Sequence, residues 1–93
     1  MRVANVIRQR LARQLAPAGL ELIDDSARHA GHAGARPEGE SHFRVTIVAE
    51  VFAGVNRIER QRMVYAALGD LMRTDIHALS ITALTPAEAQ HRD

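Results

Sequence analysis

The sequence predicts an α+β fold of element order α-β-β-α-β-α, in which two longer helices cover one face of a three-stranded mixed sheet. Apolar residues recur every four positions near the amino terminus, as in an amphipathic helix. Apolar and polar residues alternate in later segments, as in strands, and helix-capping signals stand between them. The 93 residues suffice for one domain, residues 1–93, with a single core.

The first helix is indicated by apolar residues at every fourth position, namely Val3, Ile7, Leu11 and Leu15. Pro17 and Gly19 are expected to end it, and the alternation over residues 20–22 begins a short strand. Residues 26–41 are rich in glycine and contain Pro37, so we expect a long mobile loop there.

Two further strands are predicted. The apolar residues Phe43, Val45 and Ile47 alternate with polar ones, which indicates a half-buried strand antiparallel to the first. Residues 78–84 have the same alternation. A long helix lies between these two strands, so the connection is a crossover that makes them parallel, with right-handed geometry.

The crossover helix is predicted to follow a turn at Gly54 and to open at Asn56 and Glu59, which have the spacing of a capping box. Its buried face is expected to consist of Val64, Ala67, Leu68 and Leu71. Residues 85–88 form a second capping box with proline at its favoured first position. Only alanines follow to pack, so this last helix should be short and frayed.

Composition excludes several classes of function. Only 3% of residues are aromatic against 46% hydrophobic, so the core must be aliphatic and no large stacking platform exists. A net charge of +1 attracts polyanions weakly. Without cysteine the chain forms no disulfide and offers no thiolate to a cluster, and because every basic residue counted as Lys or Arg is arginine, lysine Schiff-base chemistry is excluded.

The longest apolar run, residues 45–51, is interrupted by Thr46 and Glu50 and falls far short of the roughly 18 residues of a membrane-spanning helix. We therefore expect a soluble protein. Since residues 1–19 are basic but not rich in serine, we expect a structural helix there and not a transit peptide, and a cytoplasmic location.

Four of the five histidines stand where they can be functional. His29 and His32 lie in the glycine-rich segment, His42 opens the second strand, and His77 precedes the third. On the residues alone, a histidine placed like His77 is usually a packed or capping residue, a pair like His29 and His32 is more often solvated than ligating, and His42 is more often structural than ligating. His91 lies in the tail, where we expect no specific role.

These histidines lie in short sequence motifs that resemble those of the BolA family. The resemblance extends from Ile7 to Glu88 and rests on the words Asp24-Asp25-Ser26-Ala27-Arg28-His29-Ala30-Gly31-His32, Ser41-His42-Phe43, Val51-Phe52-Ala53-Gly54, Arg60-Gln61-Arg62-Met63-Val64-Tyr65 and Ile76-His77-Ala78-Leu79. It implies a KH-like fold and a non-enzymatic adaptor that pairs with a monothiol glutaredoxin in iron–sulfur and iron homeostasis.

The same resemblance implies a metal role for the histidines. His77 matches the family's histidine ligand to a [2Fe–2S] cluster shared with the glutaredoxin, and His29 or His32 would be the second ligand. The remaining thiolates would come from a glutaredoxin cysteine and its glutathione, which gives a Rieske-type ligand set on one iron. The isolated chain is then expected to carry no cofactor.

A second class of function is nucleic-acid binding, because the fold implied is KH-like and some BolA proteins are transcriptional regulators. The candidate contacts are Arg57, Arg60 and Arg62 at the start of the crossover helix, where backbone N–H groups favour anions. Gly31 and Gly34 match the letters of the Gly-x-x-Gly loop of KH domains but lie between strands, not helices. Where relatives have histidine between two arginines, this chain has Gln61, which loses titration and metal affinity.

A third class, a hydrolytic or transfer enzyme, has little support. Asp24, Asp25, Ser26 and His29 can be assembled into an acid, nucleophile and base. Asp-Asp-Ser at the end of a strand is far more often a turn, and no loop for an oxyanion or phosphate accompanies it.

Overall fold

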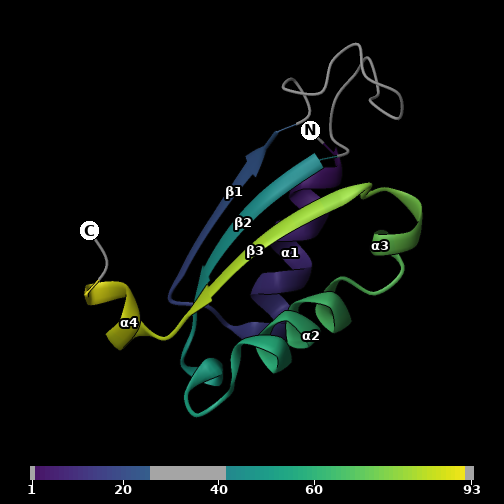
Figure 1. Ribbon diagram of the computed structural model, residues 1–93. Helices are drawn as coiled ribbons and strands as arrows, with labels where there is room; N and C mark the ends of the chain where they lie inside the picture. Colours follow the sequence, from purple (N-terminus) through teal and green to yellow (C-terminus); the bar gives the residue numbers. More distant parts are fainter. Residues whose placement is uncertain (1, 26–41, 92–93) are drawn as a thin grey trace.

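The computed structural model describes residues 2–25 and 42–91. Their elements follow the predicted order, with one additional short α-helix and a single 3₁₀ turn (Figure 1). They are α1 (Arg2–Leu15), β1 (Gly19–Asp24), β2 (His42–Val48), the 3₁₀ turn η2 (Glu50–Phe52), α2 (Arg57–Leu68), α3 (Leu71–Thr74), β3 (Ala78–Leu84) and α4 (Pro86–Gln90). The predicted glycine-rich loop lies outside the described residues.

The three strands form one mixed sheet in the order β1-β2-β3. β1 and β2 pair antiparallel with Leu22 opposite Val45, and β2 and β3 pair parallel with Val45 opposite Ile81. Both predicted strand directions are therefore confirmed. The parallel pair requires the crossover through α2, because two parallel strands cannot be joined by a tight hairpin.

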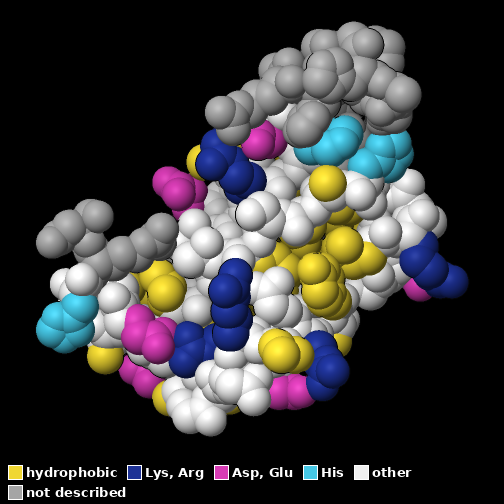
Figure 2. Space-filling view, viewed as in Figure 1, with side chains coloured by type: hydrophobic (Ala, Val, Ile, Leu, Met, Phe, Trp, Pro, Cys, Tyr) yellow, Lys and Arg dark blue, Asp and Glu magenta, His cyan; other side chains and the backbone are white. Residues whose placement is uncertain are grey.

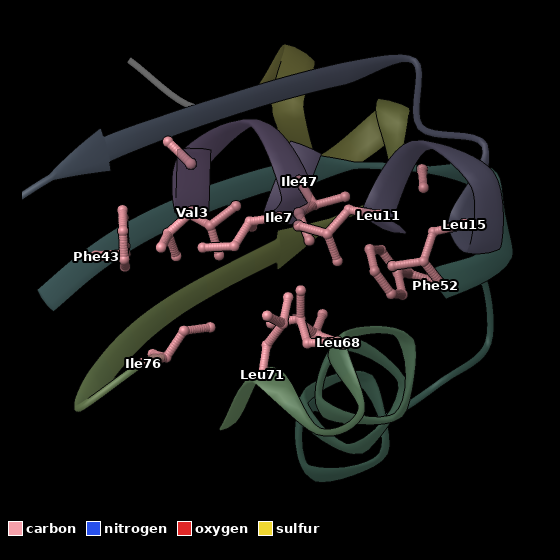
Figure 3. Close-up of a cluster of buried hydrophobic side chains, with 14 residues drawn as sticks. Val3, Ile7, Leu11, Leu15, Phe43, Ile47, Phe52, Leu68, Leu71 and Ile76 are labelled. Atoms are coloured by element: carbon pink, nitrogen blue, oxygen red, sulfur yellow. The ribbon is translucent and has the colours of Figure 1, made fainter. Parts of the chain in front are cut away.

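The core lies between one face of this sheet and the helices, as Figure 3 shows. Most of the core is aliphatic, but the prediction of a purely aliphatic core was wrong, because the two phenylalanines of the chain, Phe43 and Phe52, are its largest fully buried side chains. The fourfold repeat of α1 and the alternation of β2 supply much of it. The buried residues are Val3, Ala4, Ile7, Leu11, Leu15, Phe43, Val45, Ile47, Ala49, Phe52, Val64, Leu68, Leu71 and Ile76.

The crossover helix is broken where we predicted one continuous helix. Gly69 has a φ of 56°, which an L side chain adopts only with strain, and α2 ends at Leu68. Leu71 is buried as predicted but belongs to the separate helix α3. Nη1 of Arg10 in α1 donates to the Leu68 carbonyl oxygen at 2.8 Å, so a side chain from another helix satisfies an acceptor at the end of α2.

Both predicted helix starts are confirmed. The Asn56 side chain accepts a hydrogen bond of 2.9 Å from the Glu59 backbone N–H, although the Glu59 carboxylate pairs with Arg62 and does not complete a box. At α4 the capping box of Thr85 and Glu88 is complete. That helix is short, as predicted, and its Glu88 pairs with Arg60 of α2; the expectation that it frays stays a prediction.

Within the described ranges, none of the helices combines the length and the apolar character that a membrane span requires.

We predict that Leu11→Ala lowers the free energy of unfolding by about 2–5 kcal/mol, because truncating a buried leucine loses its burial and leaves a cavity. Leu11 is 0% exposed in α1. Urea unfolding measures the loss. Arg13→Ala, at an exposed position of the same helix, is the matched control and should change stability by no more than about 0.5 kcal/mol. Equal losses in both variants would contradict the packing described.

Candidate functional site

Two histidine side chains meet at the end of the sheet where β2 and β3 begin. His42 is the first residue of β2 and stands opposite Ala78 in the parallel ladder, so the preceding residue, His77, lies beside it. The centres of the two imidazole rings are 5.8 Å apart, and the ring planes are nearly perpendicular at 81°. Figure 2 shows two neighbouring histidines at this end of the molecule. His77 is exposed and His42 half-buried.

Each of the two histidines is next in sequence to a buried core residue, which holds its backbone in place. Ile76, directly before His77, is 4% exposed, and its backbone N–H donates to the Leu71 carbonyl oxygen at 3.0 Å. Phe43, directly after His42, is 2% exposed. Because the core holds Ile76 and Phe43, the backbone that carries the two imidazoles is anchored.

Sequence reasoning placed His77 correctly at the junction of the crossover with the third strand, but it did not pair His77 with His42. The predicted parallel pairing contained the missing signal, since aligning the starts of the two strands puts residues 42 and 78 side by side. The other predicted metal ligands, His29 and His32, lie outside the described residues. So do Ser26 and the Gly31–Gly34 segment.

A carboxylate near the pair, that of Asp25, is already engaged. Asp25 donates its backbone N–H to the His42 carbonyl oxygen at 2.7 Å, while its carboxylate pairs with Nε of Arg44 at 3.3 Å. Asp25, His42 and Arg44 help to line a pocket of about 220 Å³. Among residues 2–25 and 42–91, no three His, Cys, Asp or Glu side chains form a metal-binding group.

The donor chemistry fits half of a shared cluster. The chain has no cysteine, so nitrogen from imidazole is the ligand type that it can offer in place of thiolate. A [2Fe–2S] cluster has four protein-side ligands, and two imidazoles on one iron give the Rieske-type set. Exposed His77 stands where a second protein can approach.

The surface also has a groove between α2 and β3. It is a pocket of about 570 Å³ whose walls include Arg57, Arg60, Gln61 and Glu88. Gln61 Nε2 donates to the carbonyl oxygen of Ile81 at 3.3 Å. The residue that departs from the family pattern thus connects the crossover helix to the backbone of β3.

Arg60 is a tether inside the fold. Its side chain is 13% exposed and lies over the Phe52 ring, with 5.9 Å from Cζ to the ring centre. Nε donates to the carbonyl oxygen of Val55 at 2.7 Å, and Nη1 donates to that of Ala83 at 3.0 Å. Nη1 and Nη2 also donate to the Glu88 carboxylate, at 2.6 and 3.3 Å. One guanidinium therefore joins α2, β3 and α4.

The three arginines proposed for nucleic-acid contact thus have different environments. Arg60 is engaged by the protein itself, and Arg62 pairs with Glu59 one turn away. Arg57 is exposed on the wall of the groove. They do not present three equivalent charges to an outside anion.

The groove also contains a perturbed carboxyl group. Hydrogen bonds from the Arg60 guanidinium and from the Thr85 backbone N–H lower the pKa of Glu88 from an ordinary 4.5 to about 2. Both stabilise the ionised carboxylate, which pairs with Arg60 of α2.

In the described part of the chain, the fold is a small α+β domain with His42 and His77 at the end of the sheet where β2 and β3 begin. A family model described as "BolA-like protein" matches residues 11–88. The chain belongs to the BolA-like family, as its sequence motifs indicated.

Relatives of the chain agree with this assignment. "Protein BOLA1, chloroplastic" from Arabidopsis thaliana is 42% identical over 97% of this chain and 58% of its own length. "SufE-like protein 1, chloroplastic/mitochondrial" from the same plant is 44% identical over 88% of this chain. The chain spans only 23% of that relative, so it covers less than two thirds of either protein.

Solved structures support the fold directly. The BolA domain of SufE1 from Arabidopsis thaliana matches with a TM-score of 0.80 and 42% identity, covering 94% of each chain. The solution structure of BolA1 from Mus musculus matches with a TM-score of 0.79 and 35% identity, covering 96% of this chain and 69% of the other.

We predict that the Glu88 carboxyl titrates near pH 2, as followed by carboxyl NMR. Because the folded pKa lies below the ordinary 4.5, the contact stabilises the folded state above pH 4.5, and this contribution is lost as the pH falls from 4.5 through about 2. Arg60→Gln should raise the midpoint toward 4.5, whereas Arg62→Gln, the control, should leave it unchanged. A midpoint near 4.5 in the unmodified protein would contradict the tether.

Proposed function

We propose that this chain is a non-enzymatic partner of a monothiol glutaredoxin, with which it holds, transfers or senses a shared [2Fe–2S] cluster in iron–sulfur homeostasis. The observation that carries the proposal is the exposed His77 with a second imidazole beside it, in a chain without cysteine. Membership of the BolA-like family and a relative named SufE-like support it.

The ligand count explains why a partner is required. This chain offers no thiolate, so two of the four ligands would come from the glutaredoxin cysteine and its glutathione. A cluster with two imidazole ligands has a higher reduction potential than one with four thiolates. The role of this chain is to present His77 on anchored backbone and to add a nitrogen ligand at the interface.

The assignment of His29 or His32 as the second ligand stays a prediction, since both lie outside the described residues. The cytoplasmic location also stays a prediction, because names of plant relatives place them in the chloroplast or mitochondrion.

We expect His77→Ala to abolish the cluster spectrum characteristic of the complex while leaving the fold intact, because the side chain is exposed and its removal opens no cavity. Apo-protein is mixed with cluster-loaded monothiol glutaredoxin, and visible absorption, circular dichroism and size-exclusion mass are recorded. His91→Ala is the matched control and should behave like the unmodified protein. An unchanged spectrum in His77→Ala would remove His77 from the ligand set.

Nucleic-acid binding is the second candidate, and one comparison favours it. The "DNA-binding transcriptional regulator BolA" of Escherichia coli is 35% identical over 95% of this chain and 80% of its own length. The exposed Arg57 at the start of α2 is the cation best placed for such a contact. Engagement of Arg60 and Arg62 within the protein and the net charge of +1 count against it.

If the chain binds duplex DNA through this helix start, Arg57→Ala should weaken binding and reduce the slope of log affinity against log salt by about 0.9, the value for one lost phosphate contact. Fluorescence anisotropy over a range of salt concentrations measures both quantities. Arg73→Ala on α3 is the control and should leave the slope unchanged. The same slope in both variants would rule out Arg57 as a phosphate contact.

A further inference from the structure

We propose that His42 and His77 form a two-imidazole site for one borderline divalent metal ion, such as Cu²⁺, Ni²⁺ or Zn²⁺, on this chain alone. The proposal makes His42 a ligand in its own right. It goes beyond the shared cluster, because it requires neither a glutaredoxin nor a cluster.

The first argument is position. The parallel ladder puts His42 opposite Ala78, and the core residues Phe43 and Ile76 anchor the backbone beside each histidine. Both imidazoles therefore stand at the same end of the sheet before any ion arrives, which reduces the ordering that binding requires.

The second argument is distance. Two imidazoles bound to one ion through metal–nitrogen bonds of about 2.0–2.1 Å have their ring centres roughly 5–6 Å apart. The two ring centres are 5.8 Å apart. The angle of 81° between the rings is compatible with this, because coordination places the ion near the plane of each imidazole and does not fix the angle between the two planes.

The third argument is ligand type, which selects the ion. Imidazole nitrogen suits zinc, copper and nickel, whereas carboxylate and carbonyl oxygen suit magnesium and calcium. The neighbouring carboxylate of Asp25 is paired with Arg44. Two nitrogens then leave coordination positions open for water or for a ligand from outside.

The test uses the complete chain and Cu²⁺, followed by electron paramagnetic resonance and by competition with a copper-binding dye. We expect nitrogen hyperfine coupling from two imidazoles. His42→Asn and His77→Asn should each remove one nitrogen and weaken binding by at least roughly tenfold, since even the loss of an outer-sphere partner costs metal sites about that much. His91→Asn is the matched control and should leave the spectrum and the affinity unchanged.

Two further variants distinguish the loss of a ligand from the loss of the fold. His42→Cys keeps a ligand at this position, so it should retain Co²⁺ binding and add a sulfur-to-cobalt charge-transfer band. The double variant His29→Asn with His32→Asn should retain the two-nitrogen copper spectrum.

The proposal is overturned if His42→Asn binds copper like the unmodified chain, if His42→Cys shows no charge-transfer band, or if the His29 and His32 double variant loses the site. Failure of the cluster experiment with glutaredoxin would leave these results untouched. The two proposals can therefore fail separately.

Discussion

The parallel pairing of β2 with β3 is the constraint on which the rest of this structure depends. It requires a crossover, which places α2 against the core and the edge of β3. Its register puts His42 opposite Ala78, and thereby brings His42 and His77 together from positions far apart in the chain. A shift of β2 by one residue would turn Phe43, Val45 and Ile47 away from the core, so burial of the core excludes that change of register.

Internal structural demands determine which charges remain for outside partners. Arg60 belongs to the cluster of arginines at the start of α2, yet its guanidinium binds two backbone carbonyls and the Glu88 carboxylate. A charge used in this way stabilises the packing of α4 and β3 and contributes little to attracting polyanions. At this end of the molecule, Arg60 therefore serves the packing of the fold more than it serves nucleic-acid binding.

At the opposite end of the sheet, where β2 and β3 begin, side chains remain available to outside partners. Its two histidines present nitrogen donors on backbone that the core anchors, and among the described residues no group of three or more His, Cys, Asp or Glu side chains is placed to hold a metal ion. Such a site is incomplete by itself. Under the proposed function, a partner or exchangeable ligands would supply the remaining coordination positions.

The sequence by itself determined the helices, the strands and their directions, because periodicity, caps and crossover rules depend on residues near one another in the chain. It located His77 but not its neighbour. Only the tertiary structure decided the break at Gly69, the bond from Arg10 to Leu68, the anchoring of Glu88 by Arg60 and the meeting of His42 with His77. The break depends on backbone conformation, and the bonds of Arg10 and Arg60 depend on the reach of long side chains. The parallel pairing of the two strands was predictable, but the register that brings His42 beside His77 is given by the structure.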